Sequence, residues 1–178
     1  MNHKQNEIPF RTRRKYTSGM VLGAEDFEQE FAYIYNRMAW LNRMLLGYGT
    51  VEGLEVTSSE DEDTATSILV HAGMAIDPQG NEIVLPAAVQ CSFPETGEEA
   101  WLFLYWAERE TDPIPGAGSG SEESPTGPSR VEEYAILKYE ADQSNEKPTG
   151  VVLARLKNVM GKWEIDKKFR VRRVKAKR

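Results

Sequence analysis

The feature that most constrains this chain is a long helix-forming run in which apolar side chains recur every 3.5 residues on average. The steps between them are 4, 3, 4, 3 and 4, so they form one apolar seam along a helix. The predicted helix extends from about Ala24 to Leu46 and would be roughly 34 Å long. Its first turn is acidic, and Gly47 follows its end, as helix termini favour. The apolar seam consists of Phe27, Phe31, Ile34, Met38, Leu41 and Leu45.

A second apolar stripe on the same helix contains Tyr33, Trp40 and Met44. Together the two stripes make the helix apolar over more than half of its circumference, so it needs partners on two sides. One side could pack on the chain's own sheet and the other under a loop. Alternatively, one side packs on its own domain and the other on a neighbouring copy. A run of fewer than four heptads leaves both arrangements open.

The rest of the chain alternates with the period of β-strands. We therefore expect an α+β, mostly β fold: a long N-terminal helix, then an antiparallel sandwich or barrel-like domain of seven to eight short strands. Ala100–Ala107 is almost wholly apolar and predicts a central strand, whereas Val89–Phe93 predicts an edge strand. Asp77–Gly80 predicts a tight turn. Residues 111–129 are rich in Gly, Ser and Pro and predict a mobile loop.

Charge is distributed unevenly along the chain. Residues 1–15 contain five basic residues and one acidic residue, and residues 167–178 contain eight basic residues and no acidic one. The residues between them are strongly acidic. The expected organisation is thus a basic arm (1–15), a helix with its flanks (16–50), an antiparallel β domain (51–166) and a basic tail (167–178). Either end could be a solvated terminus, or it could dock on acidic surfaces of neighbouring subunits. The candidate anchors are Arg11, Arg13, Arg14, Arg170, Arg172 and Arg173.

The residues for most known active sites are missing from the sequence. Two histidines, His3 and His71, cannot form a His-rich metal site, and no nucleophile elbow or phosphate-binding loop is present. Cys91 is the only cysteine, so a disulfide within the chain is impossible. We expect no catalytic residue, cofactor or metal, no nucleic-acid partner because the acidic body would repel phosphate, and no membrane insertion. The absence of an apolar leader indicates synthesis in the cytoplasm.

Two segments resemble a known family. Ser18–Phe27 has the pattern Gly-Met-Val-Leu followed by Glu-Asp-Phe, and the helix leads into Leu46–Val56 with the pattern Gly-x-Gly-x-Val-x-Gly-Leu-x-Val. Val70–Leu85 then contains Gly-x-Ala-x-Asp-x-x-Gly-x-Glu-Ile. These patterns resemble baseplate-associated structural proteins of phage-tail-like contractile injection systems and related domains of phage baseplate and tail-fibre proteins. The resemblance covers residues 16–86 most closely.

The resemblance implies a non-enzymatic structural component at or near the baseplate, which mediates subunit or fibre attachment within a phage-tail-like particle. Its expected partners are other baseplate, sheath, tube or fibre subunits, with homo-oligomers in the assembly. An alternative is a glycan- or receptor-binding module of a tail fibre, in which Trp101, Trp106 and Trp163 would form a sugar platform. A small hydrolase is a second alternative.

Overall fold

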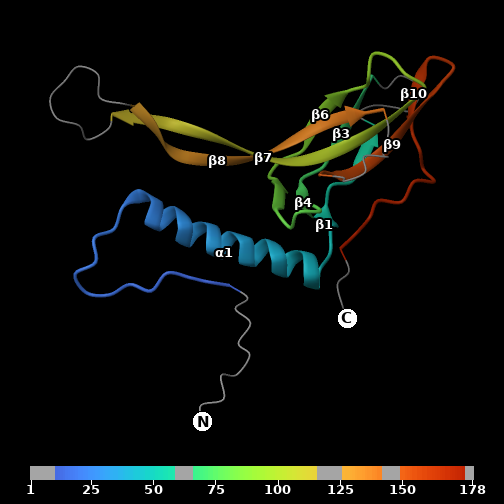
Figure 1. Cartoon of the computed structure of the whole chain (residues 1–178). Helices are drawn as coiled ribbons and strands as arrows, with labels where there is room; N and C mark the ends of the chain where they lie inside the picture. Colours follow the sequence, from blue (N-terminus) through green and yellow to red (C-terminus); the bar gives the residue numbers. More distant parts are fainter. Residues whose placement is uncertain (1–10, 59–65, 116–125, 142–148, 175–178) are drawn as a thin grey trace, which may run out of the picture.

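The computed structural model describes residues 11–58, 66–115, 126–141 and 149–174. Within these ranges one helix is followed by ten strands (Figure 1). This order confirms the predicted α+β, mostly β class, although two of the strands are long. The elements are α1 (Ala24–Leu45), β1 (Gly49–Gly53), β2 (Val56–Ser58), β3 (Ser67–Val70), β4 (Gly73–Ile76), β5 (Glu82–Leu85), β6 (Val89–Ser92), β7 (Glu99–Pro115), β8 (Thr126–Glu140), β9 (Val151–Val159) and β10 (Lys162–Ile165).

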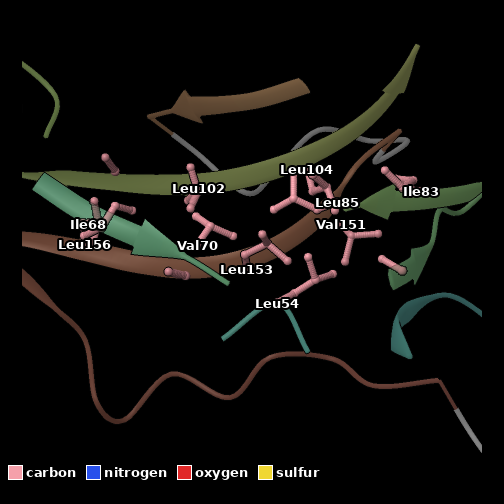
Figure 2. Packing of buried hydrophobic residues seen from close by; sticks show 13 residues of the cluster. Leu54, Ile68, Val70, Ile83, Leu85, Leu102, Leu104, Val151, Leu153 and Leu156 are labelled. Carbon is pink, nitrogen blue, oxygen red and sulfur yellow. The ribbon is translucent and has the colours of Figure 1, made fainter. Parts of the chain in front are cut away.

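The strands form three antiparallel sheets with the orders β1-β4-β5, β2-β3-β6 and β10-β9-β7-β8. Side chains from all three sheets meet in one hydrophobic core, which Figure 2 shows from close by. Leu102 and Leu104 of β7 and Leu156 of β9 are completely buried there. The central position of β7 and the edge position of β6 are as predicted.

Helix α1 begins and ends much as the sequence indicates. The backbone N–H of Gly23 donates to the Asp26 carboxylate at 2.9 Å, and this contact satisfies a donor just before the first turn. At the other end, Gly47 adopts a φ of 77° and its N–H donates to the carbonyl of Arg43. None of the helix residues is buried.

The sequence predicts one strand from Val51 to Val56, but the structure divides it. Leu54 has a φ of 63° and lies between β1 and β2, which belong to different sheets. A side chain in this conformation breaks the strand, and Leu54 is held there because it is 98 % buried in the core, with 2 % of its surface exposed. Strand β4 was not predicted, because three apolar residues after a glycine give too short a pattern.

Strands β7 and β8 form a long ribbon that projects beyond the rest of the sheet (Figure 1). Their pairing continues out to Pro115 and Thr126. The prediction of a loop over residues 111–129 is therefore wrong for residues 111–115 and 126–129, which are strand. The polar, glycine-rich composition of these residues indicated a loop. A two-stranded ribbon can have the same composition, because neither of its faces covers an apolar core. The remaining part of that predicted loop, residues 116–125, lies outside the described residues.

The basic C-terminal tail is not detached from the body where it is described. The N–H of Thr50 donates to the carbonyl of Arg172 at 2.9 Å, and the N–H of Val174 donates to the carbonyl of Thr50 at 3.1 Å. Phe169 packs edge-on against Trp101. Of the two alternatives for this tail, a solvated terminus does not describe residues 169–174, which lie against the body because the unpaired edge of β1 offers hydrogen bonds to them.

We predict that Leu102→Ala lowers the free energy of unfolding by about 2–5 kcal/mol, since it removes a completely buried side chain from the shared core. Val84→Ala on β5 is the matched control, because Val84 is exposed and its truncation leaves no cavity. Urea unfolding monitored by tryptophan fluorescence measures both. Equal midpoints for the two variants would contradict the assignment of the core.

Candidate interaction surface

Helix α1 is attached to the body through the turn between β4 and β5. Gly80 in that turn lies so close to the helix that a Cβ built on it would be 2.1 Å from the carbonyl oxygen of Ala39. The side-chain amide of Asn42 donates to the carbonyl of Gly80 at 3.0 Å and to the Glu82 carboxylate at 3.3 Å. The end of the helix nearest the sheets is therefore fixed by backbone contact, which leaves no room for a side chain at residue 80.

The buried carboxylate of Asp77 gives this turn its shape. It accepts hydrogen bonds from the backbone N–H groups of Gln79, Gly80 and Asn81 at 2.7–2.9 Å, and its second oxygen accepts one from the Asn81 side chain. Gly80 has a φ of 98°, the positive value that the sequence predicted for the turn. A turn closed by four hydrogen bonds to one carboxylate is rigid, so it holds the helix in one position.

The middle of α1 contacts the β7–β8 ribbon. The Tyr35 hydroxyl donates to the Glu133 carboxylate of β8. Partial burial and this hydrogen bond raise the pKa of Tyr35, and the negative charges of Glu133, Glu108 and Glu82 raise it further. Glu108 of β7 pairs directly with Glu133 across the ribbon, so both carboxylates lie on the face that is turned towards the helix. This side of α1 is acidic.

The opposite side of α1 is contacted by residues 11–16, which run back along the helix (Figure 1). Arg14 forms an ion pair with Asp26 at 2.6 Å and donates to Gln29 at 3.1 Å. The Tyr16 hydroxyl donates to Glu30. Further along, the guanidinium of Arg11 lies 5.2 Å from the centre of the Trp40 ring. Trp40 of the second apolar stripe thus has a partner in this segment, whereas Met44 of the same stripe is 60 % exposed.

Among the described residues, nothing covers the apolar seam itself. Its six residues are 37–69 % exposed, with Phe31 the most exposed and Leu41 the least. The seam lies between the side of α1 that faces the ribbon and the side that carries residues 11–16. Within the described ranges, the two intramolecular partners of α1 thus contact the faces on either side of the seam rather than the seam itself.

The six candidate arginines occupy different surroundings. Arg11 and Arg14 contact α1, and Arg172 donates to the carbonyl of Tyr48 while it stacks on the Tyr48 ring. Arg173 lies 3.9 Å from the Glu55 carboxylate. The remaining two, Arg13 and Arg170, are exposed. The described arginines of the two ends do not form one patch with each other, and only those of residues 11–15 lie beside the apolar seam.

Within the described ranges, no group of three or more His, Cys, Asp and Glu side chains is arranged to hold a metal ion. In the same part of the chain, no helix has the length and apolarity needed to span a membrane. Burial raises the pKa of the Cys91 thiol, which opposes nucleophilic chemistry there. Trp106 and Trp163 pack against the core, and Trp101 is enclosed by Phe169 and Arg155. The three rings are therefore not presented together as a sugar platform.

Sequence reasoning missed the residues that position the helix. The roles of Tyr35, Asn42, Glu82, Glu108 and Glu133 depend on pairs that are 38–98 residues apart, or on strand register. One signal was available: Tyr35 and Asn42 are seven residues apart and lie along one edge of the apolar seam. Polar residues that recur every seven positions beside an apolar seam are typical of a helix edge that contacts a neighbouring element.

Comparison with known proteins gives similarity at the level of the fold. No protein-family model matches the chain. No curated protein sequence matches it either. Among solved structures, a chain of the type VI secretion baseplate complex is similar over 90 % of this chain, with a TM-score of 0.54 and 14 % identity. A chain of the TssK–TssF–TssG baseplate subcomplex gives a TM-score of 0.51 and 18 % identity over 90 % of this chain. The crystal structure of TssK gives 0.51 and 14 % over 87 %.

This chain spans 59 %, 61 % and 40 % of those three chains, respectively. Identities of 14–18 % show a shared fold. The resemblance to baseplate-associated proteins of phage-tail-like systems, predicted from two sequence segments, is confirmed at that level. Two of these solved structures are of the baseplate of the type VI secretion system, and the third is TssK, a member of one of those baseplate subcomplexes.

We predict that Gly80→Ala destabilises the protein more than Gly161→Ala does. Both glycines have positive φ, so both substitutions introduce backbone strain of about 1 kcal/mol. Only at Gly80 would the new Cβ also meet a helix backbone, since nothing lies within 4 Å of the corresponding position at Gly161. Thermal unfolding measures the difference. Equal melting temperatures would show that α1 does not rest on this turn.

A pH dependence follows from the raised pKa of Tyr35. The folded protein favours the neutral hydroxyl, so its stabilisation is complete below the ordinary tyrosine pKa of 10.0 and is lost as the pH rises above that value. We expect the wild-type protein to lose more free energy of unfolding between pH 9 and pH 11 than Tyr35→Phe loses. Urea titrations at the two pH values measure this. Parallel losses would rule out the contribution of Tyr35.

Proposed function

We propose that this protein is a non-enzymatic structural subunit of the baseplate of a contractile injection system, and that it holds neighbouring subunits through the apolar seam of α1. The observation that carries the proposal is an apolar helix face that stays exposed although both flanks of the helix are in contact with the rest of the chain. The similarity of the fold to baseplate proteins supports placing this subunit in a baseplate. The seam supplies the surface through which such a subunit would attach.

The exposed seam is large for a chain of this size. Six apolar side chains, each at least one third exposed, follow one another along about five helical turns. Apolar surface of this extent marks an interaction site in soluble proteins. The rigid attachment of α1 at Gly80 presents the seam in a fixed position, so a partner that binds it loses little conformational freedom of the helix.

A second copy of the chain fits the seam well. The 4-3-4-3-4 spacing is that of coiled-coil helices, in which each apolar side chain packs into a hole between side chains of the neighbouring helix. We therefore include self-association within the assembly in the proposal. Sheath, tube and fibre subunits remain further partners of the particle in which this subunit works.

We predict that Met38→Asp abolishes assembly while it leaves the isolated subunit folded. Met38 is 52 % exposed, so a carboxylate there remains hydrated in the single chain and changes its melting temperature little. In a buried interface the same charge would be desolvated and would weaken binding by several kcal/mol. Sedimentation of the isolated variant, together with its incorporation into reconstituted particles, measures both effects.

The matched control is Asn36→Asp, which adds the same charge to an exposed position on the opposite face of α1. It should assemble as the wild-type protein does. If Met38→Asp and Asn36→Asp are incorporated equally, the apolar seam is not the attachment surface.

A further inference from the structure

The two flanks of the apolar seam differ in charge. Glu28, Tyr35 and Asn42 recur every seven residues along the flank that faces the β7–β8 ribbon. Tyr35 contacts Glu133 and Asn42 contacts Glu82, and Glu108 lies opposite Glu133 in the strand register. We name Glu28, Glu82, Glu108 and Glu133 the acidic flank.

Basic residues lie on the other flank. Arg37 belongs to the helix, and residues 11–15 are held beside it by the ion pair between Arg14 and Asp26 and by the contact of Arg11 with Trp40. Asp26 and Glu30 are also on this side, but they are outnumbered and already bonded to Arg14 and Tyr16. We name this group the basic flank; it consists of Arg11, Arg13, Arg14, Lys15 and Arg37.

Two helices that pack along a common seam bring their flanks together in a way that depends on their direction. If they run in the same direction, one flank of each helix meets the opposite flank of its neighbour. If they run in opposite directions, like flanks meet. In this protein, opposite directions would place the acidic flank against a second acidic flank, whereas the same direction places basic residues against carboxylates.

The ribbon gives an independent reason to expect a cation at the acidic flank. Glu108 and Glu133 are directly opposite each other, and like charges in such a pair destabilise a two-stranded ribbon. In the next pair along the ribbon, the guanidinium of Arg109 donates two hydrogen bonds to the Glu132 carboxylate, at 2.7 and 3.0 Å, so the two charges neutralise each other. A basic side chain from a neighbour would relieve the repulsion between Glu108 and Glu133.

We infer that copies of this chain associate with their α1 helices parallel, and that residues 11–15 of each copy contact the acidic flank of the next. This inference rests on the self-association included in the proposed function. Arg13 and Lys15 are exposed in the single chain, so they are positioned to make the contact. A contact that joins two different surfaces in this way forms a closed ring about an axis along the helices when the rotation between copies divides a full turn evenly, and an open filament otherwise.

Cross-linking tests the direction of the helices. In a Cys91→Ser background, Leu45→Cys should cross-link to itself through a short bis-maleimide reagent, because parallel helices place equal positions in one layer. Arg43→Cys, an exposed position turned away from the seam, is the control and should not cross-link. A mixture of Phe27→Cys and Leu45→Cys that cross-links with each other, with no product from Leu45→Cys alone, would overturn the parallel arrangement.

Charge exchange tests the contact between flanks. Arg13→Glu with Lys15→Glu should raise the dissociation constant about tenfold at low salt, and Glu28→Lys with Glu108→Lys should do the same. The variant with all four changes should recover the wild-type constant, since the opposite charges meet again. Glu95→Lys with Glu98→Lys, outside both flanks, is the matched control. Sedimentation equilibrium measures each constant.

Different results would overturn the contact between flanks and the self-association on which it rests. A four-residue variant that stays as weak as the two-residue variants, while Leu45→Cys still cross-links, overturns the contact between residues 11–15 and the acidic flank. A wild-type chain that remains monomeric at every concentration overturns self-association through the seam, which is part of the proposed function, and the inference falls with it.

Discussion

The contact between Gly80 and the backbone of Ala39 is the constraint on which the rest of this structure depends. It brings helix and turn so close that no side chain fits between them, and Asn42 strengthens the contact by hydrogen bonds to the turn. The buried carboxylate of Asp77 keeps the turn in the required shape. As a result the C-terminal half of α1 is fixed to this turn, and the contact of Tyr35 with Glu133 adds a second point of attachment on the ribbon.

That attachment explains why a helix with such an apolar surface has no buried residue. Two sides of α1 are in contact with other parts of the same chain. The β7–β8 ribbon contacts Tyr35, and residues 11–16 contact Asp26, Glu30 and Trp40. Among the described residues, the seam between these sides stays exposed, and the proposed function assigns it to another molecule. A shared core of three sheets makes the rest of the chain a stable support for the helix.

Much of the fold could be predicted from the sequence because its signals are local. The apolar spacing of α1, the glycine after it, the Asp77–Gly80 turn and the apolar run of β7 each depend on neighbouring residues. The break at Leu54 could not be predicted, since burial in the core holds a conformation that the residue alone disfavours. The extent of the ribbon was missed because cross-strand pairing, rather than composition, determines it. The exposed seam was found as a pattern, but only the structure shows which sides of α1 are already in contact.

Methionine oxidation of the isolated subunit and of the assembled baseplate tests most directly whether the apolar seam is an interface. Met38 lies in the seam and is half exposed in the single chain, whereas Met160, in the turn between β9 and β10, is fully exposed and serves as the internal reference. Burial of the seam predicts that oxidation of Met38 slows at least about tenfold on assembly relative to Met160, because a buried thioether excludes the oxidant. Equal rates for Met38 in the isolated and assembled states would contradict the account.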